Sequence, residues 1–416
     1  MTKHYTKPTK HCNEGVKGAS SLAQRVVGRG GASPYSHSSL IMALYGEIDY
    51  DGRVQRVASS LGELFDVTVY SIDSRRGYKN DSFRSEPIGL PPFRKGIKIL
   101  RFFYFWITFI LRAMRVNPAI IYANDSNVAI PCFIASVLTR SKFVYDAHEL
   151  FIPDEGSVFS LREEFYYRLE WAVVRWAKLV IAANRERAEI MKAHYKLKSL
   201  PLVIPNIPPM PASTISVDEL YEKYPVLKRQ SPHKIRLVYQ GDINYDRGLR
   251  VLYDAMKLLD DTFELLFVGG GISLEGMKAQ AIADGLDGRV FFSGRVPRDH
   301  LFDILQTCDI GVVIYISSSK VFLYCAPNKI YEYIQAGLPV LATCQPPLKA
   351  LVDTFNVGRM VGCKDSAVTL SPEEFADEIR AFPALYDTYK GNLGKFLSAN
   401  RWEDIKAELL NAFRNF

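Results

Sequence analysis

The chain has 416 residues, of which 48% are hydrophobic and 12% aromatic, a composition typical of globular rather than disordered proteins. This length exceeds what one hydrophobic core usually fills, so we expect two domains. The net charge of +7 is modest for a chain of this size, and we expect no nucleic-acid partner.

The six cysteines are scattered singly, without the C-x-x-C pairs of zinc sites or a regular disulfide framework. We therefore expect no disulfide, no metal and a reducing, cytoplasmic compartment. The N-terminus lacks an apolar signal core, and the longest apolar run, Phe102 to Leu111, is well short of the ~20 residues that a spanning helix needs.

Residues 1–37 are polar and basic without periodicity, which predicts a flexible extension. From residue 38 onward short apolar runs alternate with amphipathic stretches, a pattern typical of parallel sheets wrapped by helices. We predict a first doubly wound α/β domain over residues 38–211. Its expected strands are Leu40–Tyr45, Val67–Tyr70, Ala119–Tyr122, Lys142–Tyr145, Leu179–Ile181 and Leu202–Ile204.

Four prolines between Pro205 and Pro211 prevent a continuing helix or central strand and mark the domain boundary. A second doubly wound domain is predicted over residues 212–400, and residues 401–416 form an amphipathic helix that docks on a domain surface. The second domain's expected strands are Ile235–Tyr239, Glu264–Val268, Val290–Phe292, Ile310–Tyr315, Val340–Ala342 and Val357–Val361.

Ligands of open α/β sheets bind at the carboxyl ends of the strands, so two such domains predict a cleft between facing sheet edges. Gly241 opens a turn after the first strand of the second domain, and Arg247 follows near a helix start, where it can contact a phosphate. Gly269 and Gly270 follow the next strand and permit close backbone approach. Each segment alone also fits an ordinary turn.

The segment from Pro327 to Pro339 predicts a helix whose first turn contains Pro327. The helix N-terminus is an anion site to which Lys329 adds positive charge, while Glu332 lies one turn further along. Phosphate and ribose can be bound together here. The alternatives are a local ion pair between Glu332 and Lys329, and a plain capping role for Asn328 and Lys329.

These segments resemble the large retaining glycosyltransferase family 4, of GT-B architecture, over the chain from Leu40 to the C-terminus. The matching motifs are Arg247-Gly248-Leu249, Val268-Gly269-Gly270-Gly271, Phe292-Ser293-Gly294-Arg295-Val296, Pro327-Asn328-Lys329 through Pro339-Val340, Asp51-Gly52-Arg53-Val54, Tyr145-Asp146-Ala147-His148-Glu149-Leu150 and Ile204-Pro205-Asn206-Ile207-Pro208.

The resemblance implies two Rossmann-like domains facing across a cleft, with a nucleotide sugar as co-substrate and no further cofactor. Catalytic roles fall on His148, Arg247 and Lys329. Donor contacts are expected at Gly241, Gly269, Gly270, Arg295, Val296, Asn328 and Glu332. Acceptor-side contacts are expected at Asp51, Gly52 and Asp146. Two positions depart from the family pattern: Asp242 replaces its usual arginine, and Tyr324 replaces the first glutamate of its E-x-x-x-x-x-x-x-E motif.

His148 follows a strand end between two carboxylates in sequence, and the resemblance places it near the transferred sugar. A structural loop histidine is the alternative. The loop from Gly46 to Gly52 would close over the cleft, and it lacks the G-x-G-x-x-G of dinucleotide oxidoreductases. Residues 93–115 join cations to an aromatic run, which fits either peripheral contact with the inner face of an anionic membrane or a buried helix with basic ends.

We therefore predict a glycosyltransferase that moves a sugar from a nucleoside diphosphate sugar, with UDP favoured, to a saccharide or lipid-linked saccharide hydroxyl. The expected transfer retains configuration, needs no metal, and serves polysaccharide or glycoconjugate biosynthesis. The alternatives are a GT-B nucleotide-sugar epimerase, which uses the same cleft without an acceptor, and a catalytically silent nucleotide-binding scaffold.

Overall fold

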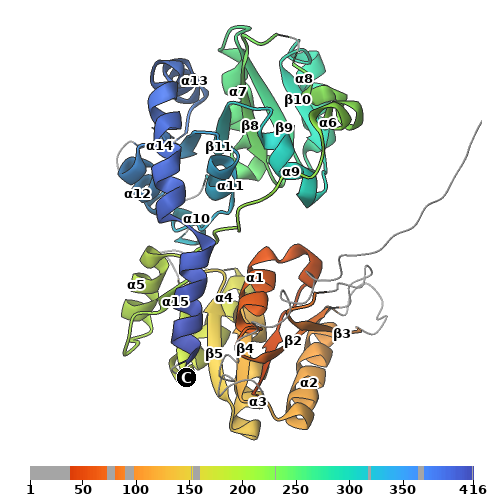
Figure 1. Ribbon diagram of the computed structural model, residues 1–416, viewed down its shortest axis with the longest axis vertical. Helices are drawn as coiled ribbons and strands as arrows, with labels where there is room; N and C mark the ends of the chain where they lie inside the picture. The colour runs from red at the N-terminus through yellow and green to blue at the C-terminus, as the bar shows by residue number, and fades with distance from the viewer. Residues whose placement is uncertain are drawn as a thin grey trace, which may run out of the picture.

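The structure is a computed structural model that describes residues 38–72, 80–89, 98–150, 152, 160–229, 231–316, 320–363, 370–414 and 416. The extension predicted over residues 1–37 and the basic residues 93–97 lie outside the described residues. Figure 1 shows two α/β units stacked along the long axis of the molecule, with the C-terminal helix lying on the first unit.

The first unit is built on a seven-stranded parallel sheet in the order β3-β2-β1-β4-β5-β6-β7. Its strands are β1 Ser39–Ala43, β2 Asp66–Ile72, β3 Arg84–Ile88, β4 Ile120–Asn124, β5 Lys142–Ala147, β6 Leu179–Ala182 and β7 Leu202–Val203. Its longer helices are α1 Gly52–Leu61, α2 Lys98–Val116, α3 Ala129–Thr139, α4 Leu161–Val173 and α5 Arg185–His194. The central strands are continuous apolar runs because helices cover both faces of the sheet.

The second unit is a six-stranded parallel sheet in the order β10-β9-β8-β11-β12-β13. Its strands are β8 Ile235–Gln240, β9 Phe263–Val268, β10 Val290–Gly294, β11 Ile310–Val313, β12 Val340–Thr343 and β13 Gly358–Val361. The helices after β7 are α6 Val217–Lys223, α7 Leu249–Lys257, α8 Leu274–Ala283, α9 Arg298–Leu305, α10 Lys320–Leu323, α11 Lys329–Gln335, α12 Pro346–Phe355, α13 Pro372–Ala381, α14 Tyr386–Ala399 and α15 Trp402–Arg414. The predicted α/β class with two doubly wound units is confirmed.

Strand β3 was not predicted from the sequence. Its residues are mostly polar and include Pro87, which has no amide hydrogen for a ladder bond. The strand forms because it lies at the edge of the sheet, where proline and charged residues are tolerated.

Helix α15 belongs to the end of the chain but packs on the first unit. Its Phe413 ring lies 6.1 Å from the Phe65 ring and 6.3 Å from the Tyr122 ring, measured between centroids. Lys406 pairs with Glu63 on the same surface. The helix therefore links the two units through a second chain crossing beside the proline-rich segment.

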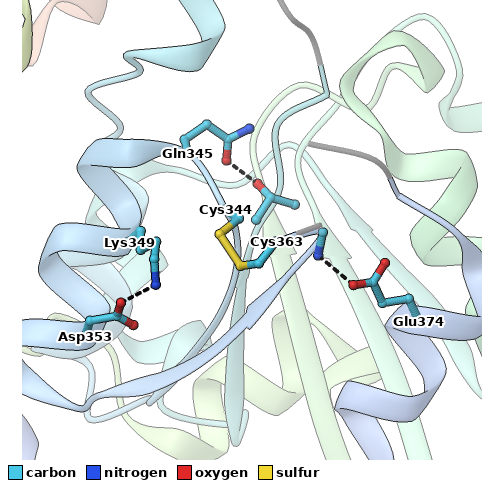
Figure 2. The surroundings of a disulfide bond; sticks show 8 residues. Cys344, Gln345, Lys349, Asp353, Cys363 and Glu374 are labelled. Atoms are coloured by element: carbon cyan, nitrogen blue, oxygen red, sulfur yellow. Dashed lines mark hydrogen bonds and ion pairs between the residues drawn. A yellow bond between two sulfur atoms is a disulfide. The ribbon is translucent and has the colours of Figure 1, made fainter. Parts of the chain in front are cut away.

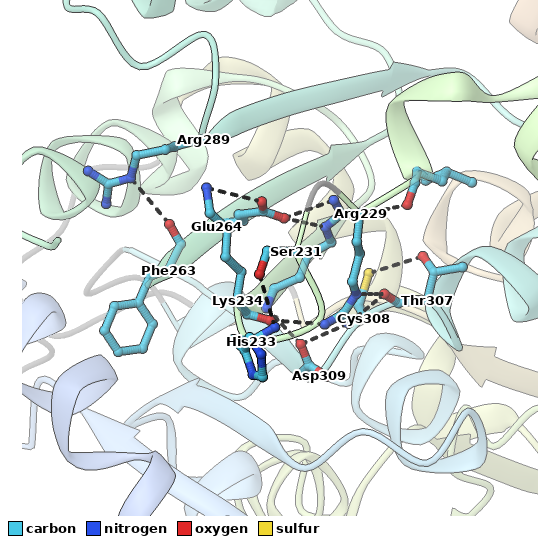
Figure 3. Close-up of polar contacts among 12 residues, drawn as sticks. Arg229, Ser231, His233, Lys234, Phe263, Glu264, Arg289, Thr307, Cys308 and Asp309 are labelled. Atoms are coloured by element: carbon cyan, nitrogen blue, oxygen red, sulfur yellow. Dashed lines mark hydrogen bonds and ion pairs between the residues drawn. The ribbon is translucent and has the colours of Figure 1, made fainter. Parts of the chain in front are cut away.

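The amino ends of the second sheet hold paired charges, drawn in part in Figure 3. Arg236 and Glu264 are both fully buried, with 2.8 Å between Nη2 and Oε2, and Lys234 lies 3.6 Å from the other carboxylate oxygen. Arg229 pairs with Asp309 at 2.8 Å. Because these groups precede β8, β9 and β11 or lie at their starts, they anchor the strands at the end opposite the predicted ligand site.

A disulfide joins Cys344 and Cys363, which corrects the expectation of unpaired cysteines (Figure 2). The two residues are 19 positions apart, and their Cα atoms lie 5.2 Å from each other. Thr343 and Val361 are register partners at the ends of β12 and β13, so each cysteine leaves its strand beside the other. Sequence spacing could not reveal a pairing that depends on strand neighbours, and cysteine usage no longer supports a reducing compartment.

Candidate functional site

A cleft of about 560 Å³ lies at the carboxyl ends of β8 and β9, bounded on one side by the start of α11. Tyr50 of the first unit also lines it, so both units contribute to its walls. Eight residues expected to bind the donor or the leaving group line this cleft: Gly241, Gly269, Gly270, Arg295, Val296, Asn328, Lys329 and Glu332.

Two of the glycines are required by close packing at the cleft floor. Gly269 has φ +142°, and a Cβ atom there would lie 1.9 Å from the carbonyl oxygen of Gly241. A Cβ atom at Gly270 would lie 2.8 Å from the side chain of Arg295. Because these two residues lack side chains, the ends of β8 and β9 and the side chain of Arg295 can lie close together at the cleft floor.

Lys329 is held between two aromatic rings beneath the cleft. Its Nζ lies 4.2 Å from the centroid of the Tyr239 ring and 5.8 Å from that of Tyr315. Burial, followed by repulsion from Arg247, lowers the pKa of Lys329 to about 7. An anion in the cleft would favour the protonated form, so this amine is suited to bind phosphate oxygens.

The lowered pKa predicts a pH-dependent affinity for nucleoside diphosphates. Below about pH 7 Lys329 is already protonated in the free protein. Above it, binding must take up a proton, so the UDP dissociation constant should rise by up to about tenfold per pH unit. Calorimetric titration across this range tests the effect. Lys329→Arg, which stays charged, should flatten the profile, and a wild-type profile as flat as the variant's would contradict it.

Arg247 lies at the edge of the site rather than among the cleft-lining residues. It ends a short 3-10 helix, Tyr245–Arg247, before α7, and its exposed guanidinium lies 3.4 Å from Asp242. It is near enough to Lys329 to lower that residue's pKa. Asp242, the departure from the family pattern, therefore pairs with the arginine that was expected to bind phosphate.

Glu332 points toward the cleft from the first turn of α11. Its carboxylate accepts a hydrogen bond from the side-chain amide of Gln240 and lies 3.4 Å from Arg298. The local ion pair considered with Lys329 is replaced by this pair with Arg298. Helix α11 begins at Lys329, two residues later than expected, and the side chain of Asn328 makes no capping hydrogen bond. The amide of Asn328 is therefore available to a ligand.

Glu332→Gln should weaken UDP binding through the ribose. Replacing a carboxylate that accepts from a charged or hydroxyl partner costs about 1.5–3 kcal/mol, roughly ten- to a hundredfold in affinity. Binding of 2′-deoxy-UDP should change much less, and Glu275→Gln on α8 serves as a control. Equal losses for UDP and its 2′-deoxy analogue would exclude direct contact with the 2′-hydroxyl.

His148 follows β5 and is supported from below by Asp146. The distance from His148 Nε2 to Asp146 Oδ2 is 3.6 Å, and Asp146 is fully buried. Arg53 donates to both oxygens of Asp146, at 3.0 and 2.7 Å, and Tyr122 adds a third bond at 2.8 Å. Burial would raise the pKa of Asp146, but Arg53 and His148 outweigh it and hold the pKa below its usual range.

Asp146 accepts three hydrogen bonds and has no exposed surface, so its geometry gives no support to the expected acceptor contact. Burial lowers the pKa of His148, but the adjacent Asp146 more than compensates, so the pKa lies above its ordinary value. Asp146 therefore orients His148 and favours its charged form.

The turn before α1 faces the donor cleft. Asp51 caps α1 by accepting from the Val54 amide at 3.0 Å. A Cβ atom at Gly52 would lie 3.6 Å from both terminal nitrogens of Arg298, in the second unit. The turn of the first unit therefore lies beside Arg298, which in turn pairs with Glu332. Asp51 serves as a cap, and Gly52, the first residue of α1, lies within contact distance of Arg298.

Sequence reasoning missed the residues that join the two units beside the site. Arg187, in α5, donates to the carbonyl of His148 at 2.6 Å and to that of Tyr324 at 2.7 Å. Asn184 donates to the carbonyl of Cys325 at 3.0 Å. These bonds fix the loop before α11 relative to His148. A polar helix start gives no sequence signal for such a role.

Family models match both halves of the chain. Residues 53–207 match the model described as Glycosyltransferase Family 4, and residues 234–382 match the one described as Glycosyl transferases group 1. The two halves are glycosyltransferase domains. No curated protein matches the chain.

Solved glycosyltransferase structures share the fold at low sequence identity. HepE from Anabaena, in a crystal structure with UDP and glucose, is 17% identical, with a TM-score of 0.70 over 91% of this chain and 100% of its own. Sucrose-phosphate synthase from Thermosynechococcus elongatus is 16% identical, with a TM-score of 0.69 over 91% and 98%. WaaG, a glycosyltransferase involved in lipopolysaccharide biosynthesis, is 17% identical, with a TM-score of 0.64 over 90% and 98%. The GT-B arrangement of the two glycosyltransferase domains is thereby established.

Proposed function

We propose that this glycosyltransferase moves a sugar from a UDP-sugar to a hydroxyl of a saccharide or lipid-linked saccharide, with retained anomeric configuration, in polysaccharide or glycoconjugate biosynthesis. The observation that carries this proposal is Lys329, an amine of lowered pKa held between two tyrosine rings at the cleft floor. The charged form of such an amine stabilises a diphosphate most strongly when negative charge develops on it during the reaction. HepE was crystallised with UDP-glucose, which supports UDP as the nucleotide.

In the proposed reaction the bond between the sugar's anomeric carbon and the diphosphate oxygen breaks, and its electron pair stays on UDP. The acceptor oxygen attacks the anomeric carbon from the same face, and its proton passes to the departing phosphate. Lys329 and Arg247 stabilise the developing negative charge, and the Lys329 amine lies at the cleft. His148 orients the sugar from the first domain.

A thermal-shift screen against UDP-, GDP- and ADP-sugars tests the donor assignment. A ligand that binds only the folded state raises the melting temperature by mass action, so UDP-sugars should give the largest shift. Lys329→Ala should lose most of that shift. A larger shift with GDP- or ADP-sugars would overturn the choice of UDP, and no shift with any of them would overturn the donor site.

The epimerase alternative has support from one fold neighbour. A putative UDP-N-acetylglucosamine 2-epimerase from Listeria monocytogenes is 11% identical, with a TM-score of 0.60 over 91% of this chain and 96% of its own. Incubation with the UDP-sugar alone separates the activities, because an epimerase converts it without an acceptor. The alternative of a catalytically silent scaffold is based on the departures from the family pattern at Asp242 and Tyr324. It predicts that the protein binds the nucleotide without turnover.

We propose that α2 and α3 rest on an anionic membrane surface. The face of α2 formed by Phe105 and Phe109 is buried, yet the opposite face exposes large apolar side chains beside those of α3. These exposed residues are Ile99, Leu100, Phe103, Tyr104, Ile107, Leu111, Met114, Val116, Ile134, Val137 and Leu138. The two helices contain no acidic residue, whereas α2 carries Arg101, Arg112 and Arg115. No helix among the described residues could span a membrane.

Vesicle co-sedimentation tests this surface. Phosphatidylcholine vesicles with added phosphatidylglycerol should retain the protein better than phosphatidylcholine alone, and salt should weaken binding, since each arginine near the surface contributes about 1 kcal/mol. Ile107→Glu with Leu111→Glu should abolish the binding. Ile282→Glu, an equally exposed position on α8, should leave it unchanged. Equal binding of both variants would contradict the proposal.

A further inference from the structure

A group of polar side chains gathers where β4 ends in the first domain. Asn124 is the last residue of β4, and the turn formed by residues 125–128, which includes a 3-10 helix over Ser126–Val128, leads into α3. The amide of Asp125 donates to the carbonyl of Asp146 at 2.9 Å, which places this turn beside the end of β5. His148 follows that end, so the turn and the histidine occupy the same edge of the sheet.

Several polar atoms in this group are buried without a hydrogen-bond partner: Asn124 Oδ1, Asp125 Oδ1, Ser126 Oγ and Asn127 Oδ1. The side-chain nitrogen of Asn124 donates to the Ala43 carbonyl at 3.0 Å, which fixes its amide so that Oδ1 stays unpaired. Asn124 and Ser126 are each 1% exposed. Buried polar atoms in native proteins are nearly always paired, so unpaired atoms on four consecutive residues indicate a missing ligand or water.

The backbone of Asp125 gives an independent indication. Its φ of 74° and ψ of 169° lie in a region that only glycine adopts without strain. Glycine would relieve the strain but would remove the carboxylate. Burial raises the pKa of this carboxyl above its ordinary value, against the opposing effect of His148. A strained, buried carboxylate destabilises the free protein, and such features concentrate at binding sites.

The chemistry of the group selects its ligand. The unpaired oxygens of Asn124, Asp125 and Asn127 can only accept hydrogen bonds while Asp125 is ionised, so a ligand must offer donors. The nearby cations are already engaged: Arg53 and His148 with Asp146, and Arg187 with backbone carbonyls. Hydroxyl groups can donate hydrogen bonds to these oxygens. An ionised phosphate group offers only acceptor oxygens, which would be repelled by them.

We propose that the turn Asn124–Asn127, together with His148, is the acceptor subsite, and that it receives the hydroxyl groups of an uncharged sugar while excluding phosphorylated sugars. The inference rests on the proposed function, because it deepens the acceptor side of the same reaction. Hydroxyl hydrogens bind Asn124, Asp125 and Asn127, and His148, held by Asp146, lies beside them.

UDP release from a UDP-sugar provides the test, measured with methyl and octyl glycosides of glucose, galactose, mannose and N-acetylglucosamine and with the matching hexose 6-phosphates. At least one neutral glycoside should accelerate release above the rate with water, and the phosphates should not. Asp125→Asn should reduce that acceleration, taken relative to the same variant's hydrolysis in water, about tenfold or more, with UDP affinity unchanged. Acceleration by phosphates alone, by no glycoside, or retained in Asp125→Asn would overturn the proposal.

A pair of serine variants tests whether the group is unpaired in the free protein. Ser126→Ala removes an unpaired hydroxyl, so the melting temperature should stay or rise while glycoside-dependent release falls. Ser136→Ala removes a hydroxyl that donates to the Phe133 carbonyl at 2.7 Å, so the melting temperature should fall with release unchanged. A loss of stability in Ser126→Ala matching that of Ser136→Ala would overturn the inference. UDP binding, followed in parallel, separates this outcome from failure of the donor site.

Discussion

Lys329→Ala is expected to weaken UDP binding by about ten- to a hundredfold and to slow transfer at least as much. The loss of one hydrogen bond between charged groups costs about 1.5–3 kcal/mol, and 1.4 kcal/mol is roughly a factor of ten. The amine is held against Tyr239 and Tyr315, so little conformational entropy is lost when it meets the diphosphate. Transfer suffers further because phosphate charge grows as the sugar departs.

Titration calorimetry with UDP and steady-state kinetics with the best UDP-sugar measure both effects. Lys278→Ala on α8, whose partner is the exposed Glu275, is the control and should change neither. Arg247→Ala should act in the same direction but less strongly, since its guanidinium is exposed to screening by salt and pairs with Asp242. Normal UDP affinity and turnover in both cleft variants would remove the cleft from the mechanism.

His148→Ala should lower turnover on the order of a hundredfold while leaving UDP affinity unchanged. The histidine belongs to the first domain, whereas the diphosphate contacts come from the second, so it meets the sugar only in the assembled site. Asp146 and Arg53 hold the ring from behind, and the raised pKa of His148 favours a charged side chain beside the departing group. Orientation and charge stabilisation suffice, because the departing phosphate takes the acceptor's proton.

The matched control is His194→Ala, a histidine at the end of α5 in the same domain, for which no kinetic change is expected. Kinetics beside calorimetric titration of UDP separate chemistry from binding, and a melting curve checks that the variant is folded. A His148→Ala enzyme with normal kcat and normal UDP affinity would return the residue to a structural role.

The alternation of short apolar runs with amphipathic stretches was enough to predict both sheets and their class. Runs such as β9 are buried along their whole length, which leaves a strong hydrophobic signal. Strand β3 left no such hydrophobic signal, because it is an edge strand that contains Pro87 and charged residues. The Cys344–Cys363 disulfide was also invisible, since it depends on β12 and β13 being neighbours.

The donor cleft could be predicted largely from the glycines and charged residues at strand ends, because parallel strands bring their carboxyl ends to one edge of the sheet. Residues that act through tertiary contacts could not be predicted in this way. Asp146 was expected to face the acceptor, but Arg53 pairs with it in the interior from 93 positions away. Arg298 and Arg187 reach the site from the first turns of α9 and α5, where an arginine ordinarily suggests only a solvated surface.

In the proposed reaction a sugar held in this cleft passes from UDP to an acceptor hydroxyl. Proton NMR of one reaction tests it most directly, with the purified protein, the UDP-sugar that gives the largest thermal shift, and the glycoside that most accelerates UDP release. We expect UDP and a new glycoside to appear together, with the donor's anomeric configuration kept, and Lys329→Ala to slow both signals equally. Conversion of the donor to another UDP-sugar in the absence of glycoside, or no consumption of any donor, would contradict the account.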